Sequence, residues 1–217
     1  MLYNIVSVVS LVITLLLTKL TIGAKKRDFI ARTVSVAVFA YKFVYFAYVN
    51  VKGTFSVPVE ISTISYFLLP IIITFKIKKL YNVGAFFGMI SGLGFFAYYS
   101  IFGFTMNAHH TLIEVLIGCF CHGYLLLCGA YLFFTNRFER KTSSSLWITI
   151  LAILCWAMVF FDEETREVTF VYFLIKPEFL NLFAVPVLNA LLKAVYYTAL
   201  SFGYYGVTRL FYALNAK

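Results

Sequence analysis

Seven long apolar runs dominate this sequence and restrict the folds that it can adopt. They cover residues 2–22, 29–50, 58–76, 81–103, 111–135, 146–161 and 183–212. A bilayer span needs roughly 20 mostly apolar residues, and the sixth run is short of that length. Because a helix satisfies its own backbone hydrogen bonds in lipid, the runs predict an all-α, polytopic bundle of seven transmembrane helices. We expect a single transmembrane domain over residues 1–217.

The composition agrees with lipid as the main solvent of this chain. The sequence is 62% hydrophobic and 12% charged, and a soluble domain of this size could not bury that much apolar surface. The net charge of +9 does not indicate a nucleic-acid partner, because the basic residues lie between apolar runs and form no basic patch interleaved with aromatic residues. The partners we expect are therefore membrane lipids.

Lysine and arginine are concentrated in alternate connections between the apolar runs. Ten of them follow the first, third, fifth and last runs: Lys25, Lys26, Arg27, Lys76, Lys78, Lys79, Arg137, Arg140, Lys141 and Lys217. The other connections hold three, which are Lys52, Arg166 and Lys176. The positive-inside rule then predicts an outer N-terminus and a cytoplasmic C-terminus. No basic region precedes the first run, so we expect a membrane span there and not a cleaved signal peptide.

Three further patterns concern packing and location. Gly84, Gly88 and Gly92 are four residues apart, which predicts a stripe suited to close helix contact. Residues 162–182 mix five acids with aromatic residues, and we expect this segment to fold onto the outer surface between the third and fifth spans. The frequent Phe, Tyr, Ile, Asn and Lys are typical of an AT-rich bacterial genome, so the expected location is a bacterial plasma membrane.

The cysteines and short motifs give no sign of a cofactor. Cys119, Cys121, Cys128 and Cys155 all lie within apolar runs, and the first two point to different faces of a helix. We interpret them as small buried hydrophobic residues. We find no GxGxxG, no GKS/T loop and no HExxH, and we expect neither cofactor nor metal.

Polar residues inside the runs are costly and indicate function. The third span opens with Glu60, Ser62 and Thr63, and the fifth carries Glu114 and a deep histidine, His122. A hydroxyl and an imidazole on facing helices can act as nucleophile and general base. Glu114 or Glu60 could orient the imidazole. Helical geometry places Thr63 on the same face as Glu60 and turns Ser62 away by roughly 200 degrees.

Other interpretations of these residues remain open. Serine and threonine in membrane helices often bond back to their own helix, and a lone histidine is often a packed polar group. His109 and His110 lie near the surface and are typical of the interface. A metal site formed by His110, Glu114 and His122 lacks the compact spacing of zinc-binding helices.

Three segments resemble the YwaF-like integral membrane proteins. VPVEISTISYFLLP (57–70) resembles the third-span motif of that family, FCHGYLLLCGAYLFF (120–134) its later span with a deep histidine, and FVYFLIKPEFLNLF (170–183) its segment before the last span. The family is similar to eukaryotic transmembrane acyltransferases that remodel ether phospholipids through a Cys and a His. It is more distantly similar to membrane hydrolases that use a Thr and a His.

The resemblance implies roles for particular residues of this chain. It places the nucleophile at Ser62, a neighbouring hydroxyl at Thr63 and the histidine at His122. The family has Cys where this chain has Ser62, and a polar residue or histidine at the position of Glu60. A family Asn-Tyr pair falls on Thr169 and Phe170. A serine without a strong base is a weaker nucleophile than a thiol, so these differences bear on activity.

Two hypotheses follow from the sequence. In the first, the protein is an intramembrane lipid acyltransferase or lipid-ester hydrolase with Ser62 or Thr63 as nucleophile and His122 as base. In the second, it is a non-catalytic subunit of a membrane complex, with other membrane proteins as partners, or a small transporter. Lys42 and Lys193, together with the acids and His122, could then couple proton or ion movement, although the sequence shows no inverted repeat.

Overall fold

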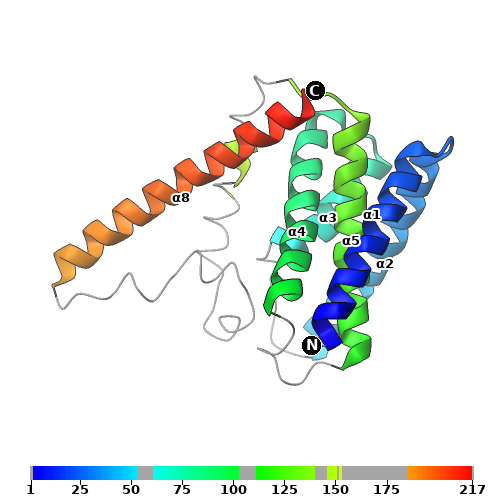
Figure 1. The fold of residues 1–217 in the computed structure, drawn as a ribbon, viewed down its shortest axis with the longest axis horizontal. Helices are drawn as coiled ribbons and strands as arrows, with labels where there is room; N and C mark the ends of the chain where they lie inside the picture. The colour runs from blue at the N-terminus through cyan, green and yellow to red at the C-terminus, as the bar shows by residue number, and fades with distance from the viewer. Residues whose placement is uncertain are drawn as a thin grey trace. The chain divides into compact units, whose positions relative to one another are not determined.

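The computed structural model describes residues 2–52, 61–102, 111–139, 146–150, 152 and 185–216. Within these ranges the chain is helical apart from short turns and loop ends, which confirms the all-α prediction. The named helices are α1 (Leu2–Gly23), α2 (Arg27–Lys52), α3 (Ile61–Thr74), the 3-10 helix η1 (Lys78–Leu80), α4 (Tyr81–Phe102), α5 (Leu112–Thr135) and α8 (Pro186–Asn215) (Figure 1).

Four of these helices are long and apolar enough to cross a membrane. Their apolar stretches are Tyr3–Gly23, Arg27–Tyr48, Lys78–Ile101 and Leu112–Thr135, within the residues that the structure describes. Helix α3 is apolar but shorter, with 14 residues. The predicted seventh span is a helix, α8, which is long but is not one of these four. Seven spans and their orientation therefore stay predictions.

The chain divides into two compact units. The first contains α1 to α5 with η1, and the second contains α8 and the chain from Phe138 onward. The single transmembrane domain over residues 1–217 stays a prediction.

In the first unit, α5 is the central helix. It contacts α1, α2, α3 and α4, and Figure 1 shows it running between α4 and α1. Of its apolar stretch 56% is buried, against 22% for α1 and 17% for α2. The outer faces of α1 and α2 carry exposed apolar side chains such as Ile13, Leu16 and Val44. Such faces suit contact with lipid acyl chains.

The predicted glycine stripe is confirmed as a close crossing of α4 on its neighbours. A Cβ added at Gly88 would lie 2.8 Å from the carbonyl oxygen of Leu125 and 2.9 Å from the Cα of Gly129, both in α5. Gly92 approaches the α5 backbone as closely, while Gly84 borders side chains of α3 and α5. Gly129 is the α5 partner of the stripe and was not predicted. These contacts fix the register of α4 against α5.

Local sequence signals account for the helix ends. Thr111 and Glu114 form a capping box: the Thr111 hydroxyl accepts from the Glu114 N–H at 3.3 Å, and the Glu114 carboxylate accepts from the Thr111 N–H at 2.7 Å. At the other end of α5, the Asn136 amide donates to the Leu132 carbonyl at 2.9 Å. Pro186 begins α8, where a missing N–H costs nothing.

The second unit is built on the C-terminal half of α8. The Phe138 N–H donates to the Asn215 side chain at 2.7 Å, and the Trp147 indole N–H donates to the Ser201 carbonyl at 3.2 Å. The rings of Phe138 and Phe211 stack with centroids 5.8 Å apart. These contacts hold Phe138 and Trp147 against the helix.

Several predictions concern residues outside the described ranges. They include the outer segment 162–182, most of the sixth run, and the side chains of Glu60, His109, His110 and Cys155. The other three cysteines are free and buried, which confirms our interpretation of them as buried hydrophobic residues.

Candidate functional site

His122 lies in the middle of α5 and is held by α4. Its Nδ1 lies 3.2 Å from the backbone carbonyl oxygen of Ser91. Its ring stacks on the Phe95 ring with centroids 3.9 Å apart and an interplanar angle of 9°. Ser91 and Phe95 are four residues apart, so one face of α4 supplies both contacts. A deep histidine in α5 is as predicted, and α4 fixes its position and ring plane.

The hydrogen bond to Ser91 determines which ring nitrogen can act as a base. A carbonyl oxygen can only accept, so Nδ1 carries the proton in this contact. In the neutral imidazole the lone pair is then on Nε2. The backbone of α4 thus orients the ring in the way that a carboxylate orients the histidine of a catalytic triad.

Helix α3 approaches His122 through Tyr66. The Tyr66 ring meets the imidazole edge-on, with centroids 5.8 Å apart at 71°. Ser62 and Thr63 lie four and three residues before Tyr66, one turn nearer the start of α3 and on the same side of the helix. Both side chains are partly buried. The Tyr66 ring therefore joins α3 to His122, one helical turn along α3 from the two hydroxyl-bearing residues.

Lys42 in α2 completes this polar cluster. Its Nζ lies 4.2 Å from the centre of the Tyr66 ring and 5.6 Å from that of Tyr45. The ammonium also lies beside the buried thiol of Cys121. A cation over an aromatic ring is attracted by the negative face of the ring, by up to about 2 kcal/mol when desolvated. This is how the half-buried lysine is accommodated within a candidate membrane span.

Glu114 stands apart from the histidine among the predicted site residues that the structure describes. The Glu114 carboxylate reaches back to Thr111, where it accepts from both the N–H and the hydroxyl. Eight residues of helix separate it from His122, or about 12 Å along the axis. The structure does not bring these two side chains together, and the Ser91 carbonyl occupies the orienting position. Glu60 lies outside the described residues.

The glycines beside His122 serve helix packing. A Cβ at Gly123 would lie 2.8 Å from the Thr14 hydroxyl of α1, and one at Gly118 would lie 3.3 Å from the Phe95 ring. Thr14 of α1 and the Phe95 ring therefore fill the space beside these two glycines.

Three members of the cluster were not identified as site residues from the sequence: Ser91, Phe95 and Tyr66. Tyr66 carried a usable signal, since it lies one turn after Ser62 on the same face. Ser91 carried none, because its backbone carbonyl makes the contact and any residue has a carbonyl. Its hydroxyl is buried with no hydrogen-bond partner among the described residues.

The arrangement offers a fixed imidazole with a free basic nitrogen, nearby hydroxyls on α3 and one lysine ammonium. These are the groups needed for attack on an ester and for stabilising the charge that develops. Within the described part of the chain, no three His, Cys, Asp or Glu side chains gather as a metal site would require.

The comparisons with known proteins add no relative to this description. No protein-family model, no curated protein and no solved structure matches the chain. The resemblance to YwaF-like proteins therefore stays a prediction that rests on the three quoted segments.

Proposed function

We propose that this protein is an intramembrane lipid enzyme that transfers or hydrolyses an acyl ester. The nucleophile is the hydroxyl of Ser62 or Thr63, and His122 is the general base. The observation that carries the proposal is the hydrogen bond between His122 Nδ1 and the Ser91 carbonyl, which directs the lone pair to Nε2. The Tyr66 contact supports it by linking the imidazole to the helix that carries both hydroxyls.

The proposed reaction has two steps. In the first, the hydroxyl oxygen attacks the ester carbonyl carbon while Nε2 takes the hydroxyl proton. The tetrahedral intermediate collapses, the alcohol leaves with the proton from Nε2, and the acyl group stays on the hydroxyl oxygen. In the second, water or an acceptor alcohol attacks the acyl enzyme in the same way. Lys42 is the candidate group for stabilising the negative oxygen of each intermediate.

The setting is part of the proposal. We place the protein in a bacterial plasma membrane as a seven-span protein with an outer N-terminus and a cytoplasmic C-terminus. The four apolar helices and the asymmetric distribution of Lys and Arg support this setting. Ser62 and Thr63, at the start of α3, would then lie in the outer half of the bilayer, where membrane lipids reach them directly.

A second candidate is a non-catalytic membrane subunit or small transporter. One observation favours it: the His122 ring is stacked on Phe95 and edged by Tyr66, as a histidine with a packing role would be. In that case His122 holds α3, α4 and α5 together, and the hydroxyls bond within their own helix as Ser65 does with the Ile61 carbonyl.

An activity assay on paired variants separates the two candidates. The purified protein is incubated with a panel of labelled ester phospholipids, and free fatty acid and transferred acyl groups are measured. His122→Phe keeps an aromatic ring for the stack but has no basic nitrogen, so we expect at least about a 100-fold loss of activity. A serine-reactive fluorophosphonate, followed by peptide mapping, is expected to label Ser62 or Thr63.

Ser65→Ala is the matched control, because Ser65 lies on the same helix and its hydroxyl bonds back to Ile61. We expect it to keep wild-type activity. Full activity in His122→Phe, or no lipid-ester activity in the wild-type protein, would reject the enzyme and leave the subunit.

A further inference from the structure

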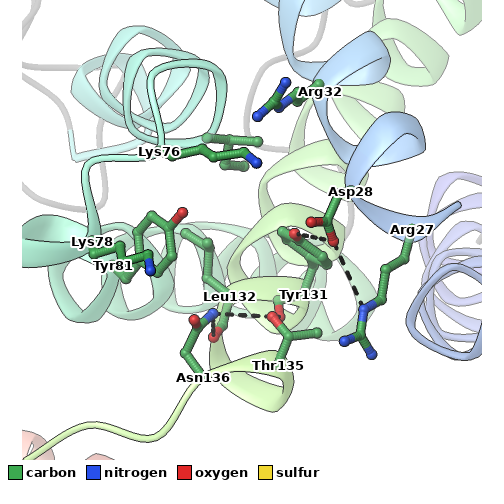
Figure 2. Close-up of a pocket in the computed structure, with 11 residues that line it drawn as sticks. Arg27, Asp28, Arg32, Lys76, Lys78, Tyr81, Tyr131, Leu132, Thr135 and Asn136 are labelled. Carbon is green, nitrogen blue, oxygen red and sulfur yellow. Dashed lines mark hydrogen bonds and ion pairs between the residues drawn. The ribbon is translucent and has the colours of Figure 1, made fainter.

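A basic pocket lies at the end of the first unit where α1, α3 and α5 finish, far along α3 from Ser62. Its volume is about 270 Å³. The lining comes from the α1–α2 turn, the α3–α4 turn and the end of α5 (Figure 2). The lining residues are Arg27, Asp28, Arg32, Ile73, Lys76, Lys78, Tyr81, Tyr131, Leu132, Thr135 and Asn136.

The charge of the pocket is strongly positive. Four cations line it against one carboxylate, a balance of +3. The carboxylate of Asp28 is already engaged, by the Tyr131 hydroxyl at 2.9 Å and by Arg27 at 3.8 Å. For Arg32, Lys76 and Lys78 the described residues provide no ion pair. Within the described ranges, none of these three cations has a carboxylate oxygen within 4.0 Å.

Two further polar side chains of the pocket, Thr135 and Asn136, form hydrogen bonds within the protein. The Thr135 hydroxyl donates to the Tyr131 carbonyl, and the Asn136 amide donates to Leu132 and to Thr135, as Figure 2 shows. Ile73 and Leu132 are buried beneath them. The pocket therefore offers a bound molecule mainly positive charge above an apolar base.

Lys76 occupies a backbone position that favours glycine. Helix α3 ends in a Schellman-type turn, in which the Ile77 N–H bonds to the Ile72 carbonyl at 3.0 Å. Lys76 lies inside that turn in the left-handed region, with φ of 53°. Glycine adopts this conformation without steric cost, whereas lysine does not. The chain thus keeps a cation at the pocket in a conformation that disfavours it.

We propose that this pocket binds a phosphomonoester group. Such a group carries up to two negative charges and three acceptor oxygens, which matches three unpaired cations of which one is a planar guanidinium. Carboxylates carry one charge and match less well. The pocket lies at the ends of α1 and α5, which are long and apolar enough to cross a bilayer, and a bilayer around them would bring its lipid headgroups to this level. The two sources of the group are the headgroup of a membrane lipid and a soluble phosphate.

The competing explanation is that the cations only set topology, as Lys and Arg do in cytoplasmic loops generally. That explanation makes every basic residue of these turns equivalent. Lys79 and Lys26 provide the contrast, since they lie in the same two turns but do not line the pocket. A specific pocket depends on Arg32 and Lys76 and not on these two lysines.

Binding of labelled phosphatidic acid, measured with the purified full-length protein in phosphatidylcholine discs, tests the proposal. We expect saturable binding that Arg32→Gln and Lys76→Gln each weaken by about tenfold, the usual effect of losing one charge-assisted contact. Lys79→Gln and Lys26→Gln remove the same charge and are expected to change the affinity by less than about twofold. Phosphatidylglycerol, a phosphodiester, is expected to compete poorly.

Equal weakening by all four variants, equal affinity for phosphatidylglycerol, or no saturable binding would overturn the proposal. Competition by inorganic phosphate assigns the source. If it displaces the lipid at similar concentrations, the ligand is a soluble phosphate; if it does not, the ligand is the lipid headgroup. Lys78→Gln is the additional variant if Lys76→Gln fails to fold, and circular dichroism checks the fold of each protein.

Discussion

At residue 76, replacing lysine by glycine should stabilise the protein while weakening the pocket. The left-handed conformation of Lys76 costs an L-residue about 1–2 kcal/mol, and glycine removes that cost at the price of some added freedom in the unfolded chain. We expect Lys76→Gly to raise the free energy of unfolding by up to about 1 kcal/mol. Unfolding by SDS in mixed micelles, followed by circular dichroism, measures the change.

Lys79→Gly is the control for this residue-scale prediction. Lys79 lies within η1 and has no left-handed backbone, so glycine there should give no gain and can cost up to about 1 kcal/mol. A loss of stability in Lys76→Gly as large as that in Lys79→Gly would mean that the side chain of Lys76 stabilises the fold. Its position at the pocket would then need no ligand to explain it.

Sequence reasoning at the residue scale identified His122 but not what holds it. A histidine in the middle of an apolar run is visible because its polarity is costly there. Its partner is a backbone carbonyl, which no residue type reveals, and the contact depends on how α4 is aligned with α5. Glu114 was the natural candidate for orienting the imidazole, because it lies on nearly the same face of α5 as His122. Its carboxylate instead caps the helix by accepting from the Thr111 N–H.

At the scale of helices, the crossing of α4 and α5 predicts a contrast between two glycines of the same helix. A methyl group at Gly88 would lie 2.8 Å from the Leu125 carbonyl, and backbone atoms cannot move aside cheaply. We expect Gly88→Ala to lower the free energy of unfolding by about 1–3 kcal/mol, the usual cost of overpacking. The same SDS titration measures this loss.

Gly94→Ala is the matched control, because no atom lies within 4 Å of the added methyl group. It should be neutral or stabilise the helix by up to about 1 kcal/mol. If Gly88→Ala is as stable as Gly94→Ala, the two helices do not approach as closely as described. A loss of the proposed lipid-ester activity in Gly88→Ala would further indicate that this crossing sets the register of the contact between His122 and the Ser91 carbonyl.

Helix existence was more predictable than helix ends or partners. Apolar runs predicted α1, α2, α4 and α5 within a few residues, because burial in lipid requires length and apolarity together. The third apolar run covers residues 58–76, whereas the structure describes α3 from Ile61 to Thr74. The basic pocket was not predicted. Three of its four cations, Arg27, Lys76 and Lys78, were assigned to topology, and their convergence depends on three helix ends meeting.

On the scale of the whole molecule, the orientation in the membrane is the prediction that remains to be tested. Helices joined by short turns alternate in direction, and the pocket gathers cations from the α1–α2 and α3–α4 turns at one end of the first unit. Moving such a cluster across a bilayer is costly, so this end should stay in the cytoplasm. The acids of residues 162–167 should then face outward.

Labelling of single introduced cysteines in intact cells tests this orientation. An impermeant maleimide should label Glu164→Cys in intact cells, and should label Lys79→Cys only after the cells are permeabilised. The unsubstituted chain is the background control, since its described cysteines are buried. Labelling of Lys79→Cys in intact cells would show that the orientation is the opposite of the one predicted. It would place the pocket outside, and the start of α3, with Ser62, would then open toward the inner leaflet and its lipids.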